Sequence, residues 1–195
     1  MAAPLVRVIA GSARGRKLKS VDDLGVRPTT DRLKESLFST LGPGIRGKRV
    51  LDLYAGSGGL GIEALSRGAE HATFVESDQS AAAMIEANLG TTGLADRAQV
   101  IRHKAERFAG GSSFGSRKPF DVVLADPPYE TGIPAAVLQG LAANGLLADD
   151  AMVVLEVSSR LENLEPPVGY RLLDARKYGD SRLLYLKQIE GEPEP

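Results

Sequence analysis

The chain has 195 residues, 43% of them hydrophobic, which is enough to bury one core and favours a single domain with a small appendage. Cysteine is absent and only two histidines are present, His71 and His103, which excludes disulfides and thiolate metal sites and argues against a resident metal. The start of the chain lacks a signal-peptide pattern, and no stretch approaches the roughly 18 consecutive apolar residues that cross a bilayer. We therefore expect a cytoplasmic protein that uses no membrane.

The net charge of −1 hides an asymmetry along the chain. Residues 1–48 carry ten Lys or Arg against four Asp or Glu, whereas the rest of the chain carries 14 basic and 21 acidic residues. A basic end on an acidic body is typical of a nucleic-acid contact, although a solvated charged terminus gives the same composition. Apolar residues interleave with the basic ones, and Gly11 and Gly15 favour turns, so the pattern predicts a short hairpin.

The predicted elements alternate along the chain. Leu33, Leu37 and Phe38 recur at helical spacing after Thr30 or Asp31, either of which can serve as the N-cap. Short apolar runs then predict strands at 49–53, 72–75, 98–101, 120–125 and 152–157, with amphipathic helices between them at 59–67, 79–89 and 133–143. Such alternation indicates parallel βαβ units. The runs at 170–177 and 182–188 are close enough to form a hairpin, which would add an antiparallel strand.

A glycine-rich loop follows the first predicted strand. Gly56, Gly58 and Gly61 have the G-x-G-x-x-G spacing, in which glycines let the backbone approach a ligand closely. The spacing alone fits either a dinucleotide or S-adenosylmethionine. Asp52 favours S-adenosylmethionine, because a carboxylate would repel a pyrophosphate but attract the ammonium and sulfonium of the methionine moiety. Glu76, 20 residues after Gly56, can accept hydrogen bonds from the ribose hydroxyls of either cofactor.

The run Asp126-Pro127-Pro128-Tyr129 follows the fourth predicted strand, at the carboxyl edge where open α/β sheets bind ligands. An exocyclic base amine is a poor nucleophile, because its lone pair is delocalised into the ring. The Asp126 carboxylate and the Pro127 carbonyl can accept its two N–H bonds and so direct the lone pair at a methyl donor. The prolines make the turn rigid, and Tyr129 offers a stacking face worth about 1–3 kcal/mol. The run predicts methylation of a base amino group.

Together these motifs resemble class I methyltransferases of the amino-methylating group. The resemblance extends to the RsmD family, which makes N2-methylguanine in 16S ribosomal RNA. It is carried by residues 7–11, 14–18, 27–32, 61–69 and 177–179. The run Arg-Pro-Thr-Thr-Asp-Arg at 27–32 is specific, whereas Asp-Pro-Pro-Tyr is shared with adenine-N6 enzymes.

The resemblance implies a fold and a division of the chain. The fold is a Rossmann-like α/β class I methyltransferase, with a mostly parallel seven-stranded sheet, an antiparallel last strand and a small N-terminal β-hairpin that helps to grip RNA. We expect a basic RNA-binding hairpin or arm at 1–28, an S-adenosylmethionine-dependent methyltransferase domain at 29–190 and a frayed tail at 191–195.

It also implies a site. The expected cofactor contacts are Asp52, Tyr54, Ala55, Gly56, Ser57, Gly58, Glu76, Ser77, Ala105 and Asp126. The guanine would be held by Asp126, Pro127, Pro128 and Tyr129. RNA contacts are expected from Arg7, Arg14, Arg16, Lys17, Lys19, Arg27, Thr29, Thr30 and Arg32. The expected cofactor is S-adenosyl-L-methionine, and the expected partner is 16S rRNA within an assembled or assembling 30S subunit, bound by a monomer without a metal.

One position departs from the family pattern, and other functions stay open. Relatives often place Asp or Asn before an alanine to receive the adenine amine, but this chain has Lys104 before Ala105. Lysine has no acceptor, so a backbone group has to serve. An adenine-N6 methyltransferase is the main alternative, although little chain is left to build a target-recognition segment. Asp126 and Tyr129 argue against a catalytically silent RNA-binding factor, and Asp52 argues against a dehydrogenase.

Overall fold

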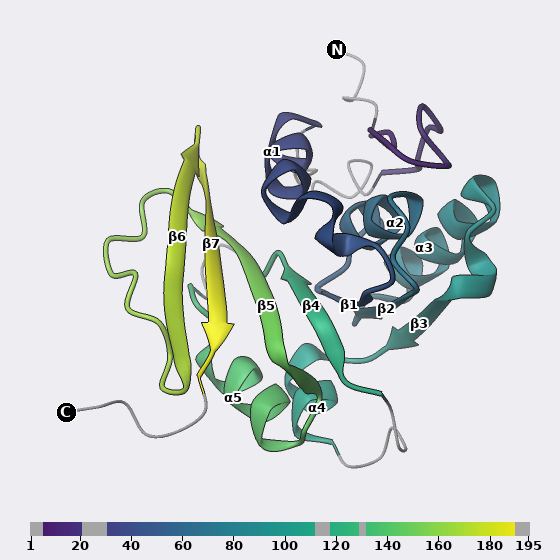
Figure 1. The fold of residues 1–195 in the computed structure, drawn as a ribbon. Coiled ribbons are helices and arrows are strands. Elements are labelled where there is room, and N and C mark those ends of the chain that lie inside the picture. The colour runs from purple at the N-terminus through teal and green to yellow at the C-terminus, as the bar shows by residue number, and fades with distance from the viewer. Residues whose placement is uncertain (1–5, 21–30, 112–117, 129–131, 190–195) are drawn as a thin grey trace.

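The computed structural model describes residues 6–20, 31–111, 118–128 and 132–189, which form a seven-stranded sheet with helices on both faces (Figure 1). The strands are β1 Arg49–Leu53, β2 His71–Glu76, β3 Ala98–Arg102, β4 Phe120–Ala125, β5 Leu147–Ser158, β6 Tyr170–Tyr178 and β7 Ser181–Gln188. The α-helices are α1 Asp31–Leu41, α2 Gly59–Ser66, α3 Gln79–Thr92, α4 Ala105–Gly110 and α5 Ala135–Ala143, and short 3₁₀ turns occupy Gly42–Ile45 and Ala95–Arg97.

The strand order is β3-β2-β1-β4-β5-β7-β6. Strands β1 to β5 pair in parallel, and β7 runs antiparallel between β5 and β6. The expected mostly parallel sheet with an antiparallel last strand is therefore confirmed. The order reverses between β1 and β4, and ligands of open α/β sheets bind beside such a switch point, at the carboxyl ends of the strands.

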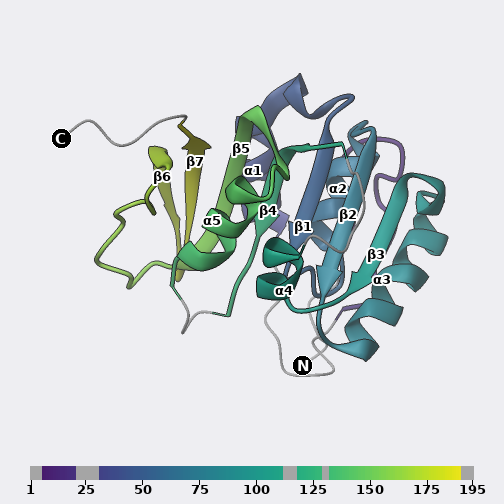
Figure 2. The same ribbon diagram turned by 90° about the horizontal axis from the view of Figure 1, so that it is seen from below.

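The two faces of the sheet have separate hydrophobic clusters. Helices α1, α2 and α3 pack on one face, and α4 and α5 on the other, as Figure 2 shows from below. The alternation of side chains along β1 explains the division, because Val50 belongs to the first cluster while Leu51 and Leu53 belong to the second. Both faces being covered, the parallel strands have nearly continuous apolar sequences.

Residues 6–20 form the expected small hairpin, and it is part of the first cluster. An antiparallel bridge joins Arg7 to Lys17, and the amide of Leu18 donates to the carbonyl of Val6 at 2.8 Å. The side chains of Val6, Val8, Ala13 and Leu18 are buried in the cluster that α1, α2 and α3 share. The hairpin is therefore packed onto the helices over its whole length.

Several bounds differ from the expected ones for identifiable reasons. Strand β5 is longer than predicted, because its first residue, Leu147, pairs with Phe120, and a register shift follows before Met152 pairs with Val122. Helix α5 begins at Ala135 because Pro134 occupies its N-cap. Helix α4 was not predicted from the sequence. None of the helices described is long and apolar enough to cross a membrane.

Candidate cofactor and RNA site

The register of the parallel strands brings the predicted site residues to one edge of the sheet. Leu53, the last residue of β1, pairs with Val75 on one side and with Ala125 on the other. The next residues along the three strands are Tyr54, Glu76 and Asp126. These positions therefore lie side by side, although 72 residues separate the first from the last.

The loop after β1 has a contorted backbone that only its sequence permits. Gly56 and Gly58 have φ values of 54° and 77°, in the left-handed region that glycine enters without a Cβ clash. Tyr54 also has a positive φ, 56°, and no other described non-glycine residue does. That conformation costs about 1–2 kcal/mol for an L-residue. Strain of this kind is typical of functional sites.

Tyr54 is held by its environment. Its hydroxyl donates to the carboxylate of Glu106 in α4 at 3.5 Å. Partial burial raises the pKa of Tyr54 to about 12, and the charge of Glu106 adds to the rise. The tyrosine therefore stays neutral and links the loop to the start of α4.

Asp52 lies beneath the loop. Its side chain is buried, and its Oδ2 accepts a hydrogen bond from the Gly61 amide at 2.8 Å. Burial raises the pKa of Asp52 to about 8, the bond from Gly61 opposes the rise, and the charge of Glu76 adds to it. Burial therefore disfavours the ionised form of this carboxyl.

Gly61 itself is required by packing. A Cβ at this position would lie 2.3 Å from Cε1 of Phe74. The absent side chain lets α2 approach β2 closely, and this approach places the Gly61 amide on Asp52. The third glycine of the motif thus supports the loop from below.

Glu76 faces the loop from the neighbouring strand. Its Oε2 accepts from the Gly56 amide at 2.8 Å, and its Oε1 accepts from the Asp78 amide at 2.8 Å and from the hydroxyl of exposed Ser77 at 3.4 Å. The side chain is half-buried. A carboxylate has about four lone-pair sites, so acceptor capacity is left for ribose hydroxyls.

The reaction motif and the start of α4 complete this edge. Asp126 is half-buried, Pro127 is buried and Pro128 is exposed, while Tyr129 lies outside the described residues. Ala105 is the buried first residue of α4. Lys104 before it is exposed and caps the helix only through its carbonyl, which accepts from the Phe108 amide at 3.0 Å.

Asn88 of α3 is a site residue that the sequence did not indicate. Its side chain is buried, and its amide group donates to the carbonyl of Ser57 at 2.9 Å and to that of Lys19 at 3.0 Å. Its oxygen accepts from the Lys19 amide at 2.8 Å. One side chain therefore joins the glycine loop to the N-terminal hairpin. A single asparagine in a helix carries no sequence signal for such long-range contacts.

Two buried charges attach the same hairpin to the helices. Glu63 accepts from the amides of Ile9 at 2.7 Å and Ala10 at 3.0 Å, and pairs with Arg67 at 2.7 Å. Lys34, fully buried, donates to the Arg7 carbonyl at 2.6 Å. Burial lowers the pKa of Lys34, and nearby Asp31 and Glu63 oppose that shift.

The predicted RNA contacts lie on the outer side of the hairpin and on α1. The six that fall in the described part of the chain are all exposed: Arg7, Arg14, Arg16, Lys17, Lys19 and Arg32. Arg7 is engaged, since its Nε pairs with Asp31 at 3.0 Å. The other three, Arg27, Thr29 and Thr30, lie outside the described residues.

Comparison with known proteins identifies the family. The model of the family described as Conserved hypothetical protein 95 matches residues 6–187, which include the hairpin, the glycine loop and the Asp-Pro-Pro-Tyr run. The chain belongs to this family. The RsmD resemblance and the expectation of an S-adenosylmethionine-dependent methyltransferase are confirmed at this level.

The relatives cover nearly the whole chain. The Ribosomal RNA small subunit methyltransferase D of Escherichia coli K12 is 38% identical over 190 residues, covering 96% of this chain and 92% of its own. A solved structure from Thermus thermophilus, hypothetical protein TTHA0928, has a TM-score of 0.77 at 33% identity. The match covers 95% of this chain and 100% of that structure. A Salinibacter ruber RNA methyltransferase in complex with S-adenosyl-L-homocysteine has a TM-score of 0.64 at 14% identity, and the match covers 87% of this chain and 98% of that structure. At this identity the likeness is evidence of a shared fold only.

Proposed function

We propose that the protein transfers a methyl group from S-adenosylmethionine to the exocyclic N2 of a guanine in 16S rRNA. The observation that carries the proposal is the register that sets Asp126 beside the glycine loop at the carboxyl edge of the sheet. The name of the Escherichia coli relative supports the rRNA substrate. The choice of guanine N2 rests on the RsmD resemblance.

The cofactor would lie along the carboxyl ends of β1 and β2. Glu76 would accept hydrogen bonds from the ribose hydroxyls. The loop from Tyr54 to Gly58 would follow the methionine moiety closely, since a Cβ at Gly56 would meet no atom nearer than the Tyr54 carbonyl oxygen at 4.0 Å. Asp52 acts through Gly61 as a positioning residue for this loop. The adenine would use the backbone of Ala105 at the start of α4, because a lysine side chain before it offers no acceptor.

The guanine amine would be held by acceptors next to the methyl group. The Asp126 carboxylate and the Pro127 carbonyl would accept its two N–H bonds, which positions the nitrogen lone pair without covalent catalysis. Pro128 keeps the turn rigid and free of a competing donor. A stacking role for Tyr129 is proposed from its residue type and position in the motif.

The RNA would reach this edge over the N-terminal hairpin. Arg14, Arg16, Lys17 and Lys19 are exposed and form no ion pair with any described residue. They represent concentrated positive charge on a chain whose other part is acidic. In this proposal residues 1–28 act as the RNA-binding arm and residues 29–190 as the catalytic domain. An assembling 30S particle suits a protein with few phosphate contacts, because shape recognition must supply the remaining specificity.

The first test of the proposal is ligand choice. Isothermal titration with S-adenosylmethionine and with NAD should give binding of the first alone. Binding of NAD without S-adenosylmethionine would end the methyltransferase proposal, since the glycine loop would then serve a dinucleotide.

The second test is the substrate. The protein should transfer a methyl group from radiolabelled S-adenosylmethionine to 16S rRNA or 30S particles from an Escherichia coli strain that lacks its own methyltransferase D. The particles should be the better substrate. A triple change of Arg14, Arg16 and Lys17 to Ala should weaken RNA binding and reduce the salt slope by about 2, at about 0.7 per phosphate contact. Unchanged binding would mean that these residues of the hairpin do not contact the RNA.

A further inference from the structure

A hollow of about 590 Å³ lies at the edge of the sheet opposite the cofactor loop. Its lining comes from the residues before three strands and from the hairpin. These residues are Gly11, Ser12, Arg46, Leu65, Ser66, Arg67, Gly68 and Arg97. Arg46 precedes β1, Gly68 precedes β2 and Arg97 precedes β3, so the hollow faces the amino ends of the strands around the last turn of α2.

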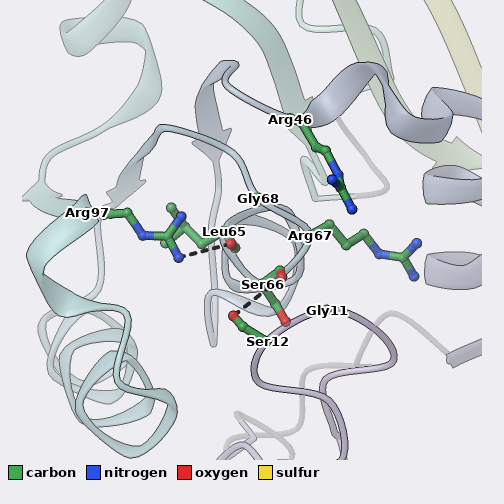
Figure 3. Close-up of a pocket in the computed structure, with 8 residues that line it drawn as sticks. All are labelled: Gly11, Ser12, Arg46, Leu65, Ser66, Arg67, Gly68 and Arg97. Atoms are coloured by element: carbon green, nitrogen blue, oxygen red, sulfur yellow. Dashed lines mark hydrogen bonds between the residues drawn. The ribbon is translucent and has the colours of Figure 1, made fainter.

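The hollow is basic, although Arg67 is paired with Glu63 at 2.7 Å. Three of its eight lining residues are arginines and none is acidic. In Figure 3, Arg97 and Arg46 extend from two different segments toward the end of α2, where Ser66 and Ser12 lie close together. Arg46 is exposed and forms no ion pair with any described residue, and its stem passes 3.3 Å from where a Gly68 Cβ would lie. A guanidinium in this state is available to an anion.

The end of α2 does not oppose an anion here. The carbonyls at a helix C-terminus carry partial negative charge when they lack donors. In this helix they have donors, because the Ser66 carbonyl accepts from the Ser12 amide at 2.8 Å, and the Leu65 carbonyl accepts from Nη2 of Arg97 at 3.2 Å. Nη1 of Arg97 donates to the carbonyl of Ala69 at 2.8 Å. These bonds use one N–H of each terminal nitrogen and hold the guanidinium in place for a ligand.

The hairpin connects this hollow to the cofactor edge. At one end Lys19 is joined to the glycine loop through Asn88, and at the other Gly11 and Ser12 contact Ser66. Between them lies the length of α2, eight residues, or about 12 Å. The exposed Arg14, Arg16 and Lys17 lie between these two ends of the hairpin in the sequence.

We propose that the hollow binds a backbone phosphate of the RNA substrate, with Arg46 and Arg97 as the cationic donors. This inference rests on the proposed function. Guanidinium groups are suited to phosphate because their planar fork presents parallel N–H donors. The contact would fix the position of the RNA at a distance from the reacting base, which sets register without reading sequence.

The experiment changes Arg46, because its guanidinium supports nothing else in the described fold. Arg46→Ala and Arg46→Glu are compared with Arg171→Ala, which removes an exposed arginine from the edge strand β6 at the far side of the sheet. Binding of unmethylated 16S rRNA is measured between about 50 and 200 mM salt, conditions under which phosphate contacts are resolved. Thermal unfolding and S-adenosylmethionine affinity are measured for each variant.

Arg46→Ala should weaken rRNA binding about 3- to 5-fold at low salt and reduce the salt slope by about 0.7, and Arg46→Glu should weaken it further. Thermal unfolding and S-adenosylmethionine affinity should not change, and Arg171→Ala should behave as wild type. The inference is overturned if both Arg46 variants bind rRNA like Arg171→Ala while the wild type methylates it. A wild-type protein that binds no rRNA overturns the proposed function as well.

Discussion

Asn88 pairs with both backbone groups of Lys19, at 2.8 and 3.0 Å, while the same side chain donates to Ser57 in the glycine loop at 2.9 Å. The N-terminal hairpin and the glycine loop therefore share one buried anchor. Because both N–H groups and the oxygen of this amide are engaged, a movement of either segment costs bonds in the other. The structure thus joins the proposed RNA-binding hairpin to the proposed cofactor loop through one buried side chain.

Asn88→Ala should weaken S-adenosylmethionine binding and lower the free energy of unfolding by about 1–3 kcal/mol, because buried backbone groups lose their partners. Asn144→Ala is the matched control, since Asn144 also makes two side-chain bonds to backbone, to Ala109 and Gly140, but on the other face of the sheet. Titration calorimetry and thermal unfolding measure both effects. An equal loss of cofactor affinity in the two variants would mean that Asn88 acts only through stability.

Gly61→Ala should destabilise the fold by about 1–3 kcal/mol, because the new methyl group would overlap the ring of Phe74. Gly90→Ala in α3 is the control, since a Cβ there meets nothing within 4 Å and should stabilise the helix by about 0.5–1 kcal/mol. Denaturant unfolding compares the two. A neutral Gly61→Ala would show that α2 does not depend on close approach to β2.

The pKa of Asp52 predicts how stability depends on pH. The folded protein keeps a proton on Asp52 up to about pH 8, whereas the unfolded chain releases it near the ordinary value of 3.8. The folded state therefore binds more protons between these values, and the free energy of unfolding falls as pH rises through this window. The amide of the Asp52→Asn variant would not titrate, so the wild type should lose stability relative to this variant as pH rises from about 5 to about 8. Unfolding temperatures that differ by a constant amount would place the pKa of Asp52 near its ordinary value.

Much of this architecture was predictable, because it rests on local patterns. The bounds of β1 and β4 match the apolar runs, and the glycine spacing located the loop. The roles of individual side chains were harder to predict. The burial of Asp52 was not predictable, because it depends on how α2 packs against the sheet, which no local pattern contains.

The contacts of the hairpin were not predictable for the same reason. Lys34 has the sequence appearance of a solvated helical lysine, yet it is fully buried against the Arg7 carbonyl. Glu63 and Asn88 form hydrogen bonds with backbone groups of the hairpin that lie 53 to 69 positions away in the sequence. Helix α4 is only six residues long, which is too short for helical periodicity to stand out.

Changes at Asp126 test its proposed chemistry. Asp126→Ala should reduce methyl transfer by about 10²–10³-fold, the usual range for one group that stabilises a transition state by hydrogen bonding. Asp126→Asn should lose less, because its amide oxygen still accepts a hydrogen bond, and both should bind S-adenosylmethionine within a few-fold of wild type. Single-turnover rates of the two variants show whether Asp126 accepts a hydrogen bond or abstracts a proton. Equal and complete loss in both variants would indicate that the negative charge itself is needed.

The identity of the methylated nucleoside tests the central claim most directly. Purified protein would be incubated with S-adenosylmethionine and 30S particles that lack the modification, and the 16S rRNA would then be digested to nucleosides for mass spectrometry. We predict that N2-methylguanosine appears, that its amount approaches one per particle and that Asp126→Ala forms far less of it in the same time. The appearance of N6-methyladenosine instead, or of no methylated nucleoside on either particles or free rRNA, would contradict the account.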